Sequence, residues 1–398
     1  MKSGHLLAFS LIVLGTIVGL SGTDLVLPAI PTLANHLPGS LALSQMVLAS
    51  FAAGTGVGLM VFGELGGRLS QHRILLVALF MYGTLSLVAA LVTSMMELVA
   101  IRFFQGFFAA APAVFAPGMI RALFDDRQAM RAIGLMGSLE SIVPAFAPIL
   151  GAWLVSQFHW QATFYATAAG AFTLFICWLF NRPPESPKAE AGHGSYLALF
   201  QIPEFLRYAI SQALTLGGLI AFVFGAPTVI IHSMDGSLSD FITMQIIGIA
   251  LFMIAANTSH LISDRIGRER TILLGSVLSA IGAGSILVYA LTFEHKAPEV
   301  LWVLFAFLNT GVGIRGPGGF FMAIFASKNN NARATAIVLL MMFLLVAGTT
   351  ALVAPFIASG LIPLALATTT LCAASLLIMW LIPGLPDDDF NTEKNISG

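Results

Sequence analysis

The feature that most constrains this chain is a series of twelve apolar runs, each about 20 residues long or longer. A helix of about 20 apolar residues spans the hydrocarbon core of a bilayer. Lipid offers backbone groups no hydrogen-bond partners, and the runs are too uniformly apolar for the alternating strands of a barrel. Only 9% of the residues are charged, against about 25% in soluble domains. The sequence therefore predicts an all-α integral membrane protein.

One polar, Pro-rich stretch interrupts the series near its middle. Residues 181–196 read NRPPESPKAEAGHGSY, a composition typical of a linker. It divides the chain into an N-terminal six-helix bundle (1–180), a linker (181–203), a C-terminal six-helix bundle (204–382) and a tail (383–398). The predicted span cores are residues 6–33, 43–66, 73–93, 97–121, 131–155, 161–180, 204–232, 239–262, 270–292, 300–325, 334–358 and 361–382.

The basic residues predict how the chain is oriented in the membrane. Lys and Arg gather in the linker and in the loops after spans 2, 4, 8 and 10, whereas the opposite loops carry only Lys296. By the positive-inside rule, both termini and the linker are cytoplasmic. We expect a multi-pass protein of a bacterial inner membrane, with lipid around it and a monomeric state.

The two halves repeat weakly. Residues 63–69 after span 2 and residues 260–268 after span 8 are similar, and they place Arg68 and Arg265 at equivalent positions. Parallel six-helix repeats are typical of transporters whose two bundles rock about a site at mid-membrane.

At these residues the sequence resembles the major facilitator superfamily, and in particular its twelve-span drug:proton antiporters of the Bcr/CflA type. The resemblance covers nearly the whole chain. The segments that carry it are the loop Asp264-Arg265-Ile266-Gly267-Arg268, the pattern L-x-x-x-R-x-x-Q-G at residues 98–106, Ala147-Pro148-x-x-Gly151-Ala152, and D-x-x-L-P-A-x-P at residues 24–31.

The resemblance implies a major facilitator fold of two pseudo-symmetric six-helix bundles, and export by proton antiport. It assigns Arg102 to proton coupling, and it implies a role in conformational gating for Arg68, Pro148, Gly151, Asp264, Arg265 and Arg268. The first-half loop departs from the family pattern, because Gly67 replaces an Asp that is thought to latch the cytoplasmic side closed. We expect Asp264 to carry more of that role.

Four ionisable residues lie well inside spans: Asp24, Arg102, Glu140 and Arg315. A charge in hydrocarbon costs several kcal/mol, so such residues usually face a partner or a water-filled path. Asp24 is predicted to accept protons and to contact a cationic substrate; the alternative is a permanent ion pair with Arg102. Arg102 is predicted to tune an acid, with a snorkelling helix anchor as the alternative.

Glu140 and Arg315 are predicted to lie near mid-membrane. Glu140 is predicted to join Asp24 in proton coupling and in substrate binding, so that proton binding competes with the substrate or resets the positions of the bundles. Pro144 and Pro148 give span 5 a hinge-like character, and the glycines and proline of residues 311–319 are predicted to loosen or break span 10. Three interpretations stay open: Arg315 binds a substrate carboxylate or phosphate, it pairs with Glu140 as a gate, or the two form a structural pair. Phe320 and Phe321 follow closely and are candidates for the substrate-binding wall.

Other classes of function find no support in the sequence. It has no Walker-type phosphate loop, no metal-ligand cluster and no nucleophile triad, so neither an enzyme nor a cofactor is expected. The net charge of −1 argues against a nucleic-acid partner. We predict a secondary transporter that exports a small organic compound or drug in exchange for protons. The alternatives are an exporter of an anionic metabolite or siderophore that uses Arg315, and a proton-driven importer.

Overall fold

The structure is a computed structural model, and it describes residues 3–182, 196–327 and 331–384. Twelve of its helical segments are long and apolar enough to cross a membrane, which confirms the predicted number and type of spans. Most of the predicted linker (183–195) and nearly all of the predicted tail (385–398) lie outside the described residues.

The first half of the chain supplies six spans. Its elements are α1 (Ser3–Asp24), the 3₁₀ helix η1 (Leu27–Asn35), α2 (Leu41–Arg68), α3 (Gln71–Ala90), α4 (Met95–Leu123), α5 (Asp126–Glu140), α6 (Val143–Gln157) and α7 (Gln161–Phe180).

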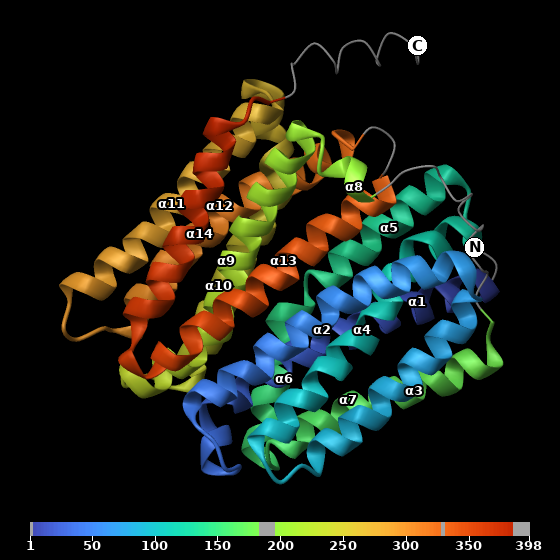
Figure 1. The fold of residues 1–398 in the computed structure, drawn as a ribbon, viewed down its shortest axis with the longest axis horizontal. Helices are drawn as coiled ribbons and strands as arrows, with labels where there is room; N and C mark the ends of the chain where they lie inside the picture. Colours follow the sequence, from blue (N-terminus) through green and yellow to red (C-terminus); the bar gives the residue numbers. More distant parts are fainter. Residues whose placement is uncertain (1–2, 183–195, 328–330, 385–398) are drawn as a thin grey trace.

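The second half supplies the other six. Its elements are α8 (Tyr196–Leu199), α9 (Pro203–Ser233), α10 (Leu238–Ile266), α11 (Arg268–Thr292), α12 (Pro298–Phe325), α13 (Asn331–Val353), the 3₁₀ helix η2 (Ala354–Ser359) and α14 (Leu361–Leu381). The two halves lie side by side (Figure 1), and most helix contacts form within one half.

Local sequence fixes where several spans begin. Ser94 accepts a hydrogen bond from the Glu97 N–H, while the Glu97 carboxylate accepts one from the Ser94 N–H, and this capping box starts α4. Ser237 and Asp240 form the same motif at the start of α10. Both motifs satisfy N–H groups that would otherwise lack partners at the helix start.

Span 5 is discontinuous. Helix α5 ends at Glu140 and α6 begins at Val143, with Pro144 in the first turn of α6. Proline has no N–H to give to the preceding turn, and its ring clashes with the carbonyl four residues earlier. The break in span 5 therefore lies next to Pro144, one of the two prolines predicted to be hinge-like, whereas Pro148 stays inside the regular part of α6.

Span 10 contradicts the sequence-based prediction of a loosened or broken helix, because α12 is continuous from Pro298 to Phe325. Its glycines instead let neighbouring helices approach. A Cβ on Gly311 would lie 2.5 Å from the backbone nitrogen of Ser279, and one on Gly313 would lie 2.6 Å from the carbonyl oxygen of Phe252. Both distances are too short for any side chain.

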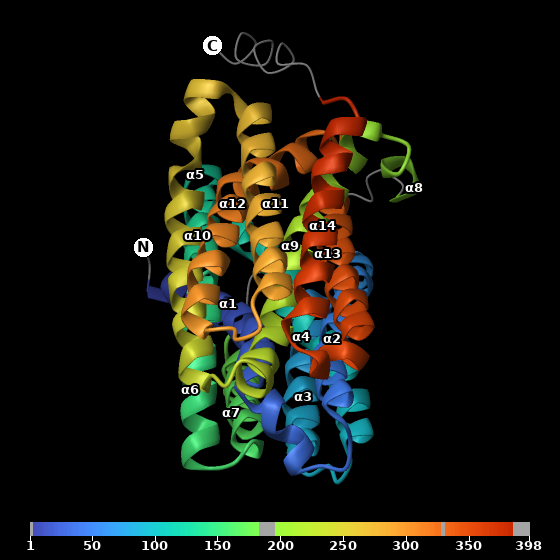
Figure 2. The ribbon, with the colours of Figure 1, turned by 90° about the vertical axis from the view of Figure 1, so that its left-hand side faces the viewer.

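The two halves meet at one end of the molecule. We call the end that holds α8, the start of α1 and the end of α14 the linker end, and the opposite end the distal end (Figure 1). Near the distal end η1 contacts α9 and η2 contacts α2, while α2 packs against α13 and α6 against α10. Figure 2 shows α10 above α6 along one side of the molecule.

Apolar packing closes the distal end. One buried cluster draws side chains from both halves, among them Leu27 and Ile30 of η1 and Phe222 and Ile230 of α9. At the linker end, by contrast, a buried cluster of the second half includes Phe205, with no buried member from the first half. Among the described residues, the buried core that the two halves share thus lies at the distal end, and Leu339 and Phe343 of α13 also pack against a buried cluster of the first half.

Candidate functional site

Arg102 lies in the distal half of α4 and is almost completely buried. Its Nη1 donates to the carbonyl oxygen of Gly22 at 2.9 Å, and its Nε donates to that of Val47 at 3.3 Å. The guanidinium carbon lies 4.1 Å from the centre of the Phe51 ring, within the range of a cation–π interaction. Nη2 has no hydrogen-bond acceptor. Arg102 therefore holds α1, α2 and α4 together, and it does not snorkel to an interface.

Asp24 is the last residue of α1 and is partly exposed. It lies two residues after Gly22, whose carbonyl binds Arg102. In the described part of the chain, no hydrogen bond or ion pair involves its carboxylate. The permanent ion pair with Arg102 is thus not formed in this conformation, and Asp24 has no cationic partner.

Glu140 ends α5 at the break in span 5 and is also partly exposed. Its carboxylate lies close to the hydroxyl of Thr16 on α1. Thr16 is eight residues before Asp24, and a rise of about 1.5 Å per residue makes this a distance of about 12 Å along α1. The Glu140 carboxylate, beside Thr16, is therefore separated from the Asp24 carboxylate by about 12 Å along the helix axis. The two acids accordingly lie along one helix at different depths.

Arg315 is fully buried inside the second half. Its Nη1 donates to the hydroxyls of Thr215 at 2.8 Å, Ser276 at 3.1 Å and Ser375 at 2.7 Å. Its Nη2 donates to the hydroxyl of Ser211 at 2.9 Å. These four residues, which we call the hydroxyl cage, come from α9, α11 and α14.

Arg315 and Glu140 do not form a pair in this conformation. No ion pair joins the two residues, and the hydroxyls that accept hydrogen bonds from the Arg315 guanidinium all belong to the second half. The guanidinium is therefore not available to a ligand between the halves in this conformation. Its positive charge is stabilised by the neutral hydroxyl oxygens of the cage.

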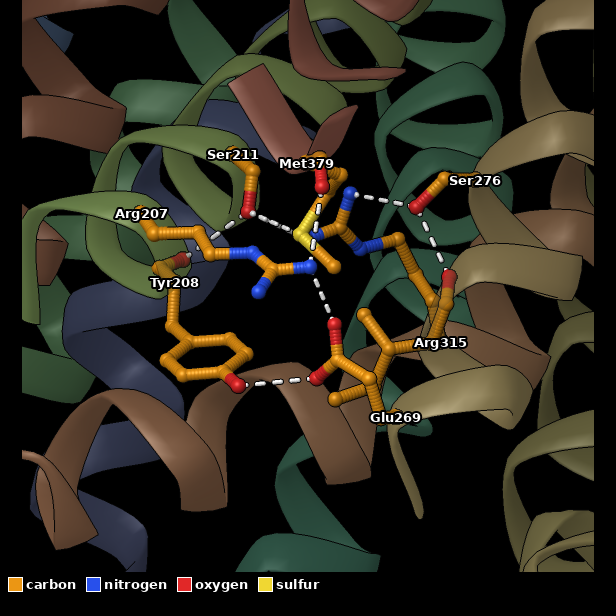
Figure 3. A network of polar contacts seen from close by, with 8 residues as sticks. Arg207, Tyr208, Ser211, Glu269, Ser276, Arg315 and Met379 are labelled. Carbon is orange, nitrogen blue, oxygen red and sulfur yellow. Dashed lines mark hydrogen bonds and ion pairs between the residues drawn. The ribbon is translucent and has the colours of Figure 1, made fainter. Parts of the chain in front are cut away.

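A second polar network, which the sequence analysis missed, lies on the linker side of the hydroxyl cage (Figure 3). Arg207 on α9 forms an ion pair with Glu269 at the start of α11 and donates to the Met379 carbonyl at 2.8 Å. The Tyr208 hydroxyl donates to the same Glu269 carboxylate at 2.8 Å. The sequence does carry a signal of this network, because Arg207 and Glu269 place opposite charges at the linker ends of spans 7 and 9.

Two hydrogen bonds join the halves near the distal end. Gln45 on α2 donates from Nε2 to the Thr228 hydroxyl on α9 at 2.8 Å, and both side chains are buried. The Nε2 atom of His232 lies 2.9 Å from the Pro31 carbonyl oxygen of η1. Neither contact was foreseen, because a lone Gln or Thr inside a span carries no sequence signal of its partner.

The remaining predicted site residues lie apart from these charges. Phe320 packs against a buried cluster at the linker end of the second half, and Phe321 is 49% exposed beneath Arg268, whose guanidinium carbon is 5.1 Å from its ring centre. Asp264 and Arg265 are exposed at the linker end of α10.

The predicted gating residues of the first half have distinct surroundings. Arg68 pairs with Glu64 at 2.6 Å on the exposed surface of α2. Pro148 is buried within α6. A Cβ on Gly151 would lie 2.3 Å from the Leu25 carbonyl oxygen, so this glycine lets α6 approach the distal end of α1, next to Asp24.

In the described residues there is no group of three or more His, Cys, Asp or Glu side chains that could hold a metal ion. The site that geometry offers is instead a set of ionisable groups at membrane depth, distributed over two helix bundles.

A comparison with known families decides the class of protein. The family model described as "Major Facilitator Superfamily" matches residues 12–351. The chain belongs to the major facilitator superfamily. It is therefore a multi-pass secondary transporter of a small molecule, and not an enzyme.

Individual superfamily members agree with this assignment. A bicyclomycin resistance protein homolog of Haemophilus influenzae is 27% identical over 297 residues, which cover 71% of this chain and 73% of that protein. The multidrug resistance protein MdtL of Shewanella oneidensis is 25% identical over 300 residues, covering 74% and 75%. The resemblance to Bcr-type members of the superfamily is thereby confirmed.

The fold of the superfamily is confirmed by a solved structure. The crystal structure of a D-xylose-proton symporter matches with a TM-score of 0.73 at 15% sequence identity, over 95% of this chain and 98% of that one. At this identity the similarity concerns the fold alone.

Proposed function

We propose that this transporter exports a small organic compound in exchange for protons, by alternating access. Relatives named for bicyclomycin and multidrug resistance support the direction and the kind of cargo. The observation that carries the proposal is the state of Asp24, a partly exposed carboxylate at membrane depth without a cationic partner. A carboxyl group in such surroundings is more stable when it is protonated.

Arg102 gives the proton a way to act on the helices. Its Nη1 holds the Gly22 carbonyl just before Asp24, and its Nη2 has no acceptor. When Asp24 loses its proton, the new negative charge attracts the Arg102 guanidinium, which binds the carbonyl two residues earlier. Moving Arg102 toward Asp24 weakens its bonds to Gly22 and Val47, which join α1 and α2 to α4. Proton release thus favours another arrangement of the first half, which is the requirement for coupling.

Glu140 is proposed as a second group for proton or substrate. It lies at the C-terminal end of α5, where the helix dipole places partial negative charge. A broken span with such an end is a recurring ion-binding element of transporters. Substrate contacts by Arg315, Phe320 and Phe321 require a conformation other than the present one, since Arg315 is enclosed by its hydroxyl cage. The anionic-cargo alternative therefore draws no support from the arrangement around Arg315.

Gating is proposed at both ends. At the distal end, the Gln45–Thr228 and His232–Pro31 contacts and the apolar cluster must separate for the cargo to leave. At the linker end, we assign closure of the opposite side to Arg68, Asp264, Arg265 and Arg268. The break at Pro144 and the close contact at Gly151 are proposed to let α6 move with α1. The positive-inside rule makes the linker end cytoplasmic, in a bacterial inner membrane, with the protein acting as a monomer.

The test is proton-coupled transport by the purified protein in liposomes, with a pH-sensitive dye inside. Asp24→Asn is expected to abolish substrate-driven proton movement, because the amide cannot exchange a proton. Asp235→Asn is the matched control: Asp235 is an exposed residue with a φ of 51°, a conformation that Asn tolerates as well as Asp. Full proton coupling in the Asp24 variant would remove the proposed role of this residue.

A further inference from the structure

A groove of about 700 Å³ lies between α11 and α12 toward the distal end, away from the charges described above. Ile281, Gly284, Ser285 and Val288 line it from α11, and Val300 and Leu304 line it from α12. The four α11 residues follow the spacing i, i+3, i+4, i+7, so they share one face of the helix. No heavy atom lies within 4 Å of where a Cβ of Gly284 would be, so this glycine forms an open floor.

The groove opens on the outside of the second half. Ile281 is 52% exposed and Val288 58% exposed, and α11 lies at the edge of the molecule away from the first half (Figure 1). On a membrane-spanning helix such apolar exposure faces acyl chains. From Ile281 to Phe293, a rise of about 1.5 Å per residue gives a length of about 18 Å, which suits an acyl chain lying along the helix.

The chain segment next to the distal end of the groove, residues 294–299, carries charge of both signs. His295 lines the groove at this end and is followed by Lys296, with Glu294 and Glu299 on either side. None of the ion pairs found in the described residues involves these four side chains. Residues 294–299 contain two basic and two acidic side chains, so their net charge is zero when the histidine is protonated. An anionic lipid headgroup therefore gains little net electrostatic attraction from this segment.

We propose that this groove binds one molecule of phosphatidylethanolamine from the leaflet at the distal end. One acyl chain lies over Gly284 between α11 and α12. The headgroup phosphate is bound by Lys296 and His295, and the ammonium group by Glu294 and Glu299. The zwitterionic headgroup matches both signs of the loop, and a filled groove stabilises the packing of α11 against α12, the helix that carries Arg315.

The test is lipid retention in native mass spectrometry, combined with thermal unfolding of delipidated protein. Phosphatidylethanolamine added to the delipidated protein is expected to bind one molecule per chain and to raise the unfolding temperature more than phosphatidylglycerol does. Gly284→Phe fills the floor of the groove and is expected to reduce retention at least tenfold. The matched control is Gly348→Phe, at another helical glycine with nothing within 4 Å of its Cβ position.

Two surface variants separate headgroup recognition from folding. Lys296→Gln and Glu299→Gln are each expected to weaken retention of phosphatidylethanolamine while leaving the unfolding temperature of the lipid-free protein unchanged. Equal retention of the two lipids, or unchanged retention in Gly284→Phe, would overturn the proposal. A dimer that Gly284→Phe dissociates would also overturn it, because a second copy would then occupy the groove. The readouts are binding and stability, so the result does not depend on the proposed proton coupling.

Discussion

Replacing Arg315 by Lys or by Met tests whether the hydroxyl cage holds a cation through its geometry. The guanidinium makes four hydrogen bonds, to hydroxyls on three helices. A lysine ammonium has three donors on a single nitrogen, so at least one of the four bonds is lost while the charge stays buried. A hydrogen bond to a charged group contributes about 1.5–3 kcal/mol. We therefore expect Arg315→Lys to lose about 2–3 kcal/mol of stability.

Methionine has a different effect, because it removes the charge as well as the bonds. Each cage hydroxyl also has an acceptor of its own. Ser211 donates to the Tyr208 carbonyl, Ser276 to the Ile272 carbonyl, and Thr215 and Ser375 to the Ser211 carbonyl. Arg315→Met therefore leaves no buried donor without a partner, and the loss of four bonds is offset by relief from burying an ion. We expect Arg315→Met to be more stable than Arg315→Lys.

The assay is thermal unfolding of the purified variants in detergent, followed by fluorescence-detected gel filtration. A loss of about 2–3 kcal/mol corresponds to a fall of about 4–12 °C in the unfolding temperature for a half of this size. Arg73→Lys, at an exposed position near the start of α3, is the control and is expected to unfold with the wild type. An Arg315→Lys protein as stable as the wild type, or more stable than Arg315→Met, would refute the reasoning.

Two further predictions concern other polar contacts. Gln45→Leu removes a buried bond of about 1 kcal/mol between the halves, so we expect the population open at the distal end to rise about fivefold. The rate at which a cysteine introduced at the distal end is labelled measures this open population. Thr370→Val, on an exposed helix surface, is the control and should leave the labelling rate unchanged. Glu269→Gln leaves Arg207, which is 6% exposed, without its anionic partner, and should lower stability by about 3 kcal/mol in the same unfolding assay. Glu64→Gln breaks an exposed ion pair and should lower stability by less than about 1 kcal/mol. Equal losses of stability in Glu269→Gln and Glu64→Gln would show that burial does not strengthen the Arg207–Glu269 pair.

Sequence patterns predicted those features that depend on one segment at a time. Apolar length determines that a segment spans the membrane, so the spans were predicted without knowledge of their neighbours. The irregularity of span 5 at Pro144 follows for the same reason, since a proline acts on the turn of its own helix. The family motif at residues 98–106 likewise identified Arg102 before its partners were known.

Glycine in span 10 shows where this reasoning fails. The composition of residues 311–319 fits both a broken helix and a helix that neighbours approach closely. The backbone nitrogen of Ser279 and the carbonyl oxygen of Phe252, both distant in sequence, lie against these glycines and show that the helix is one that its neighbours approach closely. A glycine pattern alone does not contain that information.

Depth in the membrane follows from counting residues along a helix, whereas the direction in which a side chain points depends on the helices around it. Sequence alone therefore determined that Asp24, Arg102, Glu140 and Arg315 lie at membrane depth. The tertiary structure decided that Arg102 binds backbone carbonyls and that Arg315 binds four hydroxyls. It also decided that, within the described residues, Asp24 and Glu140 form no ion pair. The partners of Arg315 come from positions 39 to 104 residues away, and only the packing of separate helices brings them together.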